Sequence, residues 1–211
     1  MYLPLFFKAD ELSCLIIGGG KVALHKMDKL TSLSSSLTMI SPEIIPEVNV
    51  YVHQYKIKLL RREFQNGDCK DYDLIIAATS NRDVNRKIAD EAKALHIPVN
   101  VVDDPELCTV IFSADHRDGD FIVAISTSGK APYLAGGIRN KIAHFTSGLG
   151  HWVKIASQFR MVVNRDVVDP ARKKYYLKLF ATRIPERSLI QPRPEDDLDV
   201  WLDWLMKMDE E

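Results

Sequence analysis

Cysteine is scarce in this 211-residue sequence, which has three residues of this type and no Cys-x-x-Cys pair. An odd number of widely spaced cysteines, Cys14, Cys69 and Cys108, argues against a disulfide framework and predicts no zinc site. No apolar run reaches the roughly 18 residues of a membrane span, and the first residues lack the basic start and apolar core of an export signal. We therefore expect a globular protein of the reducing cytoplasm, without a membrane partner or a stored metal ion.

An excess of either charge is also missing, since 28 Lys and Arg nearly balance 29 Asp and Glu. The balance hides a segregation along the chain. Residues 151–193 contain 10 Lys and Arg against 3 acidic residues, whereas residues 194–211 contain 1 against 8. The basic segment is either a solvated helical face or a site for a polyanionic ligand, and charge blocks alone do not distinguish the two.

Short apolar runs rich in β-branched residues recur in the first half of the chain, and such runs are typical of strands buried on both faces of a parallel sheet. The predicted strands are CLIIG, LTMIS, DLIIAAT and IPVNVVD. Between them, apolar residues recur at helical spacing. One predicted helix places Ala23, Met27 and Leu30 on one face, and another places Val84, Ile88, Ala92 and Leu95 on one face behind an N-cap at Asn81. This alternation indicates an α/β fold with a parallel sheet.

The pattern changes near residue 108. Residues 108–127 are predicted to form two antiparallel strands around a turn at Asp118–Gly119, with His116 and Arg117 in that turn. A single histidine at such a place is expected to be a surface residue rather than an iron ligand. After Pro132 the sequence is predicted to be helical, and this helical part has breaks near Pro170, near Pro185 and at the linker QPRPEDD.

Three glycines stand between the first predicted strand and the first predicted helix, in the pattern Gly18-x-Gly20-x-x-Ala23. In a dinucleotide-binding fold the first glycine permits a tight turn, the second lets the backbone approach a pyrophosphate, and the third small residue lets helix and strand pack closely. N–H groups at the helix start then bind the phosphates. The predicted cofactor-binding residues here are Gly18, Gly19, Gly20, Lys21, Val22 and Ala23. The alternatives are a glycine-rich turn without a ligand and a methyl-donor site on a related fold.

A second cofactor-binding stretch follows the next strand. Ser41 ends that strand, and Pro42 and Glu43 come directly after it, where a ribose-binding acid is expected. No arginine stands beside these residues in the sequence, which favours NAD over NADP as the cofactor.

Six motifs in unbroken order resemble the siroheme synthase amino-terminal family, which comprises precorrin-2 dehydrogenases with or without sirohydrochlorin ferrochelatase activity. They are YLPLFF, CLIIGGGKVALHK, ISPE, LIIAATSNRDVN, IPVNVVDDPELC and VAISTSGKAPYLA. The resemblance implies a Rossmann-like NAD-binding domain at 1–107, a dimerisation segment with exchange of elements between subunits at 108–148, and a helical C-terminal domain at 149–211. It also implies a homodimer that oxidises precorrin-2 to sirohydrochlorin with NAD. Some members then insert Fe²⁺, as a substrate, to give sirohaem.

Asp103 matches the essential aspartate of this family and is the predicted catalytic residue, as a base or as an electrostatic partner of developing positive charge. Without the family pattern, the neighbouring Asp104 confuses the assignment, and Asp103 could merely cap the next turn. The resemblance also implies that Thr79 lies on the nicotinamide side of the cofactor, and Ala78 beside it is a further predicted cofactor-binding residue. The resemblance also implies that Asn100 orders the Asp103 loop. Further predicted substrate-binding residues are Lys130 and the polar loop of Ser126, Thr127 and Ser128 that precedes it; this loop alternatively caps the following helix.

A tetrapyrrole with many carboxylate arms needs several Lys or Arg residues, and the basic block 154–193 with Arg139 and Lys141 can supply them. Two features depart from the family pattern. Gly136–Gly137 stand inside a predicted helix, where bulkier or basic residues are usual. The sequence also ends without the methyltransferase domain of some relatives, which predicts a stand-alone enzyme that receives precorrin-2 from another protein.

Two other functions fit the glycine pattern, namely a non-catalytic NAD-sensing regulatory module and an NAD dehydrogenase for a smaller substrate. A sensor gives no reason for Asp103, and a small substrate gives none for the long helical extension. The glycine pattern begins too near the N-terminus for a preceding winged helix, and residues 1–150 are close to neutral. No nucleic-acid partner is therefore expected.

Overall fold

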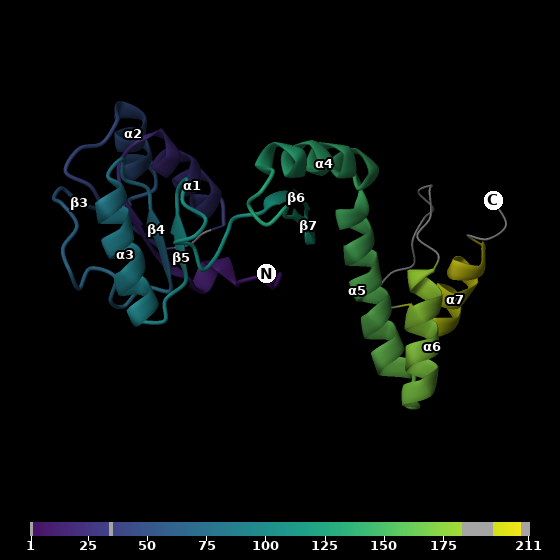
Figure 1. The fold of residues 1–211 in the computed structure, drawn as a ribbon. Helices are drawn as coiled ribbons and strands as arrows, with labels where there is room; N and C mark the ends of the chain where they lie inside the picture. The colour runs from purple at the N-terminus through teal and green to yellow at the C-terminus, as the bar shows by residue number, and fades with distance from the viewer. Residues whose placement is uncertain (1, 34–35, 183–195, 208–211) are drawn as a thin grey trace. The chain divides into compact units, whose positions relative to one another are not determined.

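The computed structural model describes residues 2–33, 36–182 and 196–207 (Figure 1). The chain divides into two compact units. The first comprises Met1–Phe112 with Ser126–Ala131, and the second comprises Ser113–Ile125 with Pro132–Glu211. The division into residues 1–107, 108–148 and 149–211 remains a prediction about how the chain is organised for function.

The first unit contains a five-stranded parallel sheet in the order β3-β2-β1-β4-β5. This is the expected Rossmann-like α/β architecture, and all four strands predicted from the sequence are present. The elements in chain order are η1 (Ala9–Glu11), β1 (Ser13–Ile17), α1 (Lys21–Thr31), β2 (Ser36–Ile40), α2 (Pro46–Gln54), β3 (Lys58–Leu60), β4 (Leu74–Ala77), α3 (Arg82–Ala94) and β5 (Val99–Val101). The strand order reverses between β1 and β4, so their carboxyl ends define the switch point where open α/β sheets bind ligands.

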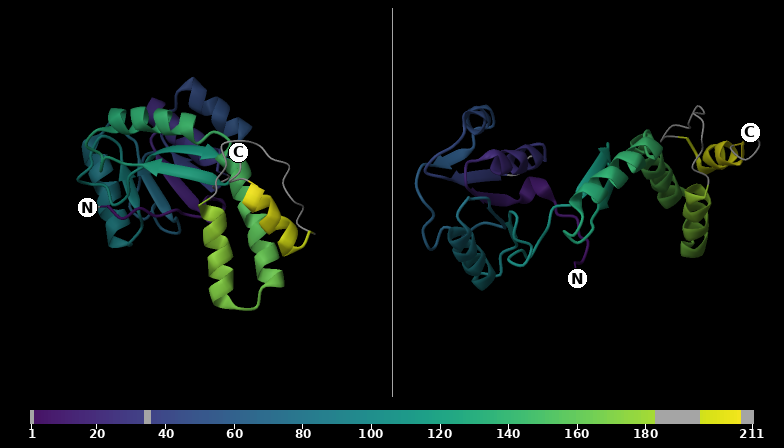
Figure 2. Two further views of the ribbon diagram at one scale, coloured as in Figure 1. Left: turned by 90° about the vertical axis from the view of Figure 1, so that its right-hand side faces the viewer. Right: turned by 45° about the horizontal axis from the view of Figure 1, so that its top comes forward.

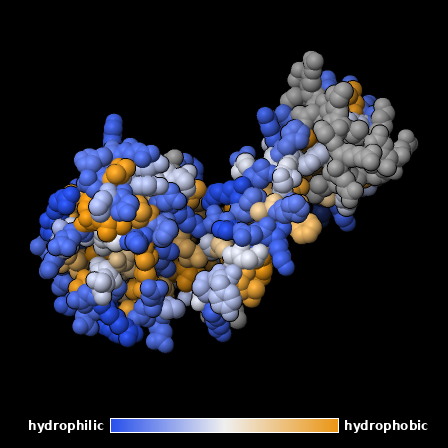
Figure 3. Space-filling view, turned by 90° about the horizontal axis from the view of Figure 1, so that it is seen from above, coloured by the Kyte–Doolittle hydropathy of each residue, from blue (hydrophilic) through white to orange (hydrophobic). Residues whose placement is uncertain are grey.

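Helices cover both faces of this sheet, with α1 and α2 on one side and α3 on the other (Figure 1). Successive residues of β1 point to opposite faces: Leu15 packs with the α3 side, and Ile16 with the α1 and α2 side. Both side chains are fully buried, which explains why β1 is apolar at every position from Cys14 to Ile17 rather than at alternate ones. Apolar side chains also reach the surface of this unit, where they are interspersed with hydrophilic ones (Figure 3).

The predicted apolar face of α3 extends one residue too far. Asn81 is the N-cap, as expected, and its side-chain oxygen accepts hydrogen bonds from the Asp83 and Val84 N–H groups. Ile88 and Ala92 are buried, but the helix ends at Ala94, and Leu95 is the C-cap with 44% of its surface exposed. The backbone leaves the helical path there, so Leu95 no longer points toward the core.

The second unit begins with the antiparallel pair β6 (Ala114–Asp118) and β7 (Phe121–Ile125). Asp118 pairs with Phe121, so the turn residues are Gly119 and Asp120 rather than Asp118 and Gly119. Gly119 has φ +56, a left-handed conformation that suits glycine in a two-residue hairpin turn. His116 and Arg117 consequently lie on β6 and not in the turn.

The helices described after this pair are α4 (Pro132–Phe145), α5 (Leu149–Asp166), α6 (Pro170–Ala181) and α7 (Leu198–Lys207). Helices α5 and α6 run side by side as a hairpin with α7 beside α5 (Figure 2). The Phe159 ring stacks on Phe180 at 5.1 Å and meets Trp201 at 5.7 Å between ring centroids, so aromatic packing forms this core. Pro170 begins α6, as predicted. The predicted break near Pro185 and residues 191–195 of the predicted linker lie outside the described residues.

Candidate functional site

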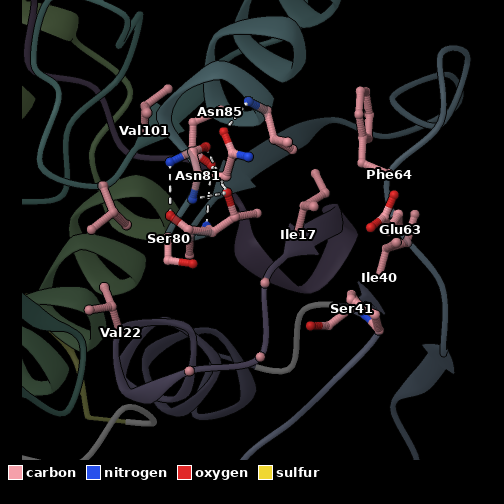
Figure 4. A pocket seen from close by; sticks show the side chains of 18 of the residues that line it. Ile17, Val22, Ile40, Ser41, Glu63, Phe64, Ser80, Asn81, Asn85 and Val101 are labelled. Atoms are coloured by element: carbon pink, nitrogen blue, oxygen red, sulfur yellow. Dashed lines mark hydrogen bonds between the residues drawn. The ribbon is translucent and has the colours of Figure 1, made fainter.

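A cavity of about 1100 Å³ opens at the carboxyl ends of β1, β2, β4 and β5 (Figure 4). We call it the strand-end cavity. Its volume lies just above the usual range of about 300–1,000 Å³ for small-molecule sites. The predicted site residues that line it are Gly18, Gly19, Gly20, Lys21, Val22, Ser41, Pro42, Glu43, Ala78, Thr79 and Asp103. The described lining does not include Ala23, Asn100, Ser126, Thr127, Ser128 or Lys130.

The three positions of the loop differ in the physical reason for which they hold glycine. Gly18 has φ +118, and a Cβ there would lie 2.3 Å from the Ala78 carbonyl oxygen. A Cβ on Gly19 would lie 2.4 Å from the Glu43 carbonyl oxygen. Gly20 has φ −92, and its Cβ would meet no atom within 4 Å. The fold itself therefore requires glycine at 18 and 19, whereas position 20 faces open space in the cavity.

Helix α1 starts directly after this loop with an uncapped N-terminus. Gly20 is the N-cap, so no side chain accepts a hydrogen bond from the first-turn N–H groups. Such a helix start favours an anionic group such as a pyrophosphate. Lys21 and Val22 are exposed at this end of the cavity, whereas Ala23 is fully buried beneath the helix. Ala23 thus serves close packing between helix and sheet, as the glycine pattern predicted.

The end of β2 forms another wall. Ser41 is buried, and its hydroxyl donates to the Glu43 carbonyl oxygen at 2.5 Å, so this side chain shapes the loop. Glu43 is exposed on the cavity wall. Glu63 and Phe64, which follow β3, lie on the same side of the cavity as Ser41 (Figure 4). Sequence analysis missed Glu63 and Phe64 because β3 has only three residues and no periodic signal.

Hydrogen bonds fix the loop between β4 and α3. The Thr79 hydroxyl donates to Asn85 Oδ1 at 2.7 Å, and Asn85 Nδ2 donates to the Thr79 carbonyl oxygen at 3.0 Å. Asn85 is buried at 6% exposure and lines the cavity, although sequence analysis did not single it out. Thr79 is therefore held in one orientation at the wall of the cavity.

The two adjacent aspartates after β5 lie in different environments. Asp104 is buried and accepts a hydrogen bond from Arg82 Nε at 3.0 Å. Asp103 is exposed on the cavity wall in a left-handed conformation with φ +58, and its carboxylate makes no hydrogen bond within the described parts of the chain. The tertiary structure thus separates a structural carboxylate from one that is available for chemistry.

A lysine on α1 adds positive charge near this loop. Lys26 is half-buried, with its Nζ 4.0 Å from the centre of the Phe112 ring. Burial and the neighbouring Lys29 lower the pKa of the Lys26 ammonium, while the charge of Asp103 acts in the opposite direction. Lys26 is therefore a cation within electrostatic reach of Asp103, and no motif pointed to it.

The segment after Asp103 is fastened back onto β5. The Cys108 thiol donates to the Val101 carbonyl oxygen at 3.2 Å and accepts from the Val101 N–H at 3.1 Å. Asn100 Nδ2 donates to the Val110 carbonyl oxygen at 3.0 Å. Asn100 is buried and does not line the cavity. Its contact with Val110 is consistent with the role that the resemblance implied, which is to order the loop that contains Asp103.

The remaining predicted substrate residues lie in the connection between β7 and α4. The Thr127 hydroxyl accepts a hydrogen bond from the Ala131 N–H at 3.0 Å, and the Ser126 hydroxyl accepts one from the Ser128 N–H at 3.0 Å. Both hydrogen bonds lie within this connection, before α4 begins at Pro132, so neither caps the first turn of that helix. Contact of Ser126, Thr127, Ser128 and Lys130 with a substrate remains a prediction. Among the described residues, no three His, Cys, Asp or Glu side chains gather as a metal site.

A parallel sheet with a glycine loop, an uncapped helix start and a cavity at its switch point defines a dinucleotide-binding protein. The sequence pattern of the family described as "Putative NAD(P)-binding" matches residues 5–114. The chain belongs to this family.

Curated relatives extend the similarity beyond the sheet. The "Siroheme synthase" of Pseudomonas paraeruginosa is 39% identical over 190 residues, which cover 89% of this chain and 41% of that protein. The "Siroheme synthase" of Methylococcus capsulatus is 34% identical over 196 residues, which cover 92% of this chain and 41% of that protein. The chain thus spans about two fifths of the length of these relatives. The solved structure "SirC, precorrin-2 dehydrogenase" covers 100% of both chains with a TM-score of 0.68 and 19% identity, so the fold is shared. None of the helices in the described residues is both long enough and apolar enough to cross a bilayer.

Proposed function

We propose that the chain is an NAD-dependent precorrin-2 dehydrogenase, which oxidises precorrin-2 to sirohydrochlorin during sirohaem synthesis. The observation on which this rests is the presence of an exposed aspartate, Asp103, on the wall of a dinucleotide cavity. Relatives named siroheme synthase over 89% of the chain support the substrate class. Location in the cytoplasm remains a prediction from cysteine usage.

The strand-end cavity fits NAD by the chemistry of its walls. The open backbone at Gly20 and the free helix start accommodate a pyrophosphate, and Glu43 supplies a carboxylate for ribose hydroxyls. Thr79, fixed by Asn85, lies toward β4 and β5, where the nicotinamide end is expected. NAD supplies the hydride acceptor. The pair of electrons leaves a ring-bridging carbon of precorrin-2 as hydride, and a proton leaves the macrocycle.

Asp103 is the proposed acceptor of that proton. Its carboxylate lies on the cavity wall without a hydrogen-bond partner in the described residues, whereas Asp104 is occupied by Arg82. The left-handed backbone at Asp103 turns the chain sharply at the end of β5, and Asp tolerates this conformation better than most residues. A carboxylate held there can act as a base or stabilise positive charge in the macrocycle.

We also propose that the protein is a homodimer formed through its second unit. Helix α4 exposes a row of apolar side chains, with Tyr133 83% and Phe145 82% exposed and Leu134 and Ile138 beside them. The pair β6 and β7 forms a sheet of two strands, which is marginal by itself. The dimerisation role that the resemblance implied for 108–148 fits both features, because a second copy would cover the apolar row and the open strand edges.

Insertion of Fe²⁺ into sirohydrochlorin is a further proposed activity, with the ion as a substrate. It requires loss of two pyrrole protons and no nicotinamide, so Asp103 could serve both steps. The alternative function is a non-catalytic NAD-sensing module, and turnover of precorrin-2 by the wild type would exclude it.

Asp103→Asn tests the proposal, because it keeps the side-chain shape and removes its charge and basicity. We expect the turnover of precorrin-2 with NAD to fall by about a hundredfold or more. The absorbance of the product sirohydrochlorin measures this turnover. NAD affinity and the melting temperature should stay near the wild-type values. Glu106→Gln is the matched control, since Glu106 is an exposed carboxylate of the same loop outside the cavity. Full turnover by Asp103→Asn would contradict the catalytic role, and a wild type without turnover would favour the sensor.

The same variant separates the two activities. If Asp103 accepts pyrrole protons, Asp103→Asn should fail to convert supplied sirohydrochlorin and Fe²⁺ into sirohaem, whereas Gly20→Val should still do so. An inactive wild type in this assay would restrict the function to the oxidation.

A further inference from the structure

An arginine lies close to the end of the cavity where NAD and NADP differ, although none follows Glu43 in the sequence. The Ser41 N–H donates to the Leu60 carbonyl oxygen at 3.1 Å, so the carboxyl ends of β2 and β3 are adjacent. Arg61, Arg62 and Glu63 follow this end of β3 in turn, and of these Glu63 lines the cavity. The parallel sheet thereby brings Arg62 to the region where a ribose 2′-substituent is expected.

Arg62 is paired with Asp68 and is not among the residues that line the cavity. Two parallel hydrogen bonds of 2.7 Å join the guanidinium to the two carboxylate oxygens. The Gln65 N–H also donates to Asp68 Oδ2 at 2.7 Å, and Arg62 Nη1 donates to the Glu63 carbonyl oxygen at 3.0 Å. The Asp68 side chain is only 13% exposed. A two-pronged pair with a largely buried carboxylate fixes the guanidinium in one orientation.

The charge of Asp68 is secure at neutral pH. Hydrogen bonding to the Arg62 guanidinium holds the pKa of the Asp68 carboxyl below its usual range. The pair therefore persists under the conditions in which a nucleotide binds.

The cavity wall beside this pair is acidic. Its residues from the segments after β2 and β3 include the carboxylates of Glu43 and Glu63 and no Lys or Arg. The neighbouring Arg61 is directed to Asn49 of α2, with Nη2 3.5 Å from Asn49 Oδ1. NADP differs from NAD by a 2′-phosphate, which needs a guanidinium or ammonium and is repelled by carboxylates.

We propose that Asp68 is a specificity-determining residue, which keeps Arg62 out of the ribose end of the strand-end cavity and so makes the protein select NAD against NADP. The inference rests on the proposed function, since it assumes that this cavity binds the dinucleotide. It assigns the choice of cofactor to an ion pair outside the cavity lining, in addition to the acid at the end of β2.

Asp68→Asn is the test, because the amide keeps the shape and an acceptor for the Gln65 N–H while it gives up the charge that binds Arg62. Calorimetric titration should show NADP affinity raised by about tenfold or more, with NAD affinity changed by less than about threefold, since a charge-assisted contact to phosphate is gained only with NADP. Adding Arg62→Gln to this variant should cancel the gain. Arg62→Gln alone should leave NADP affinity at the wild-type value.

Asp73→Asn is the matched control. Asp73 also accepts a backbone hydrogen bond, from the Ser13 N–H at 2.8 Å, but it lies at the amino end of β1, away from the cavity. It should leave both affinities unchanged. Asp68→Ser, which retains an uncharged acceptor, provides a second variant if the amide lowers the melting temperature too far for titration.

The possible results distinguish a failure of the inference from a failure of the proposed function. A wild type that binds neither nucleotide contradicts the proposed function. A wild type that binds NAD, with no gain for NADP in either Asp68 variant, overturns the inference alone. A gain that persists after Arg62→Gln overturns it as well, because Arg61 or the altered net charge would then be responsible.

Discussion

Position 20 offers a substitution that should remove cofactor binding and leave the fold unchanged. Gly20→Val places three carbon atoms where the structure has no atom within 4 Å of the Cβ, on a backbone with φ −92 that valine adopts without strain. The first unit should therefore melt within a few degrees of the wild type. The added side chain instead occupies the space next to the helix start, where the pyrophosphate is expected.

The size of the effect follows from the contacts that are lost. A backbone N–H bonded to a charged phosphate oxygen contributes about 1.5–3 kcal/mol. Displacement of the phosphate from one such N–H weakens NAD binding by roughly tenfold to 150-fold, and displacement from two makes it too weak to measure by calorimetry. We expect at least a tenfold loss of NAD affinity.

Gly18→Ala is the contrasting variant from the same loop. Its Cβ would lie 2.3 Å from the Ala78 carbonyl oxygen on a backbone with φ +118. Backbone strain and overpacking each cost about 1–3 kcal/mol, so the melting temperature should fall by roughly 10 °C or more. Calorimetric titration and thermal unfolding of both variants test the pair of expectations. Unchanged NAD affinity in Gly20→Val, or wild-type stability in Gly18→Ala, would refute the reasoning.

Two further predictions concern the thiols and the assembly. Burial raises the pKa of the Cys14 thiol to about 12 and also raises that of Cys69, so at pH 8 only about one Cys14 thiol in ten thousand is ionised. Iodoacetamide should leave both unlabelled in the folded protein and label both in guanidinium, as mass spectrometry would show; rapid native labelling would contradict their burial. Light scattering of the wild type should give about twice the chain mass of 24.0 kDa, and Phe145→Asp should shift the mass toward the monomer. A wild type of 24.0 kDa would exclude the homodimer.

The parts of the fold that the sequence predicts are those where one local cause dominates. Strands β1, β2, β4 and β5 were predictable because burial on both faces makes most of their residues apolar, with Thr38 and Asn100 as buried polar exceptions. Strand β3 has one lysine among three residues, so its place depends on pairing with β2 and not on its own pattern. The hairpin turn was misplaced by one residue because register fixes it, and register is a property of two strands together.

The residues of the candidate site also divide into those that local sequence predicts and those that depend on tertiary contacts. Asp103 and Asp104 are identical in type and adjacent in sequence, and the tertiary structure distinguishes them. Asp104 is buried and accepts a hydrogen bond from Arg82, 22 residues earlier, whereas Asp103 is exposed on the cavity wall. Asn85 was missed because a polar residue on a helix gives no sign of whether it meets solvent or a loop. The glycine loop was predictable because its residues are adjacent in sequence, although the separate reasons for Gly18 and Gly20 depend on which backbone atoms the fold brings next to each.

The cofactor preference shows that, at the edge of a parallel sheet, separation in the sequence is a poor guide to which residues lie close together in space. The absence of arginine beside Ser41 and Glu43 favoured NAD, yet the sheet places the end of β3 next to Ser41 and so brings Arg62 close. The preference for NAD then depends on whether that guanidinium is free, and Asp68 binds it with two hydrogen bonds. The preference for NAD is therefore attributed to the pairing of a nearby arginine, and not to the absence of one. An acid at the end of one strand would be insufficient if the next strand delivered an unpaired arginine, so Asp68 and Glu43 must act together to exclude a 2′-phosphate.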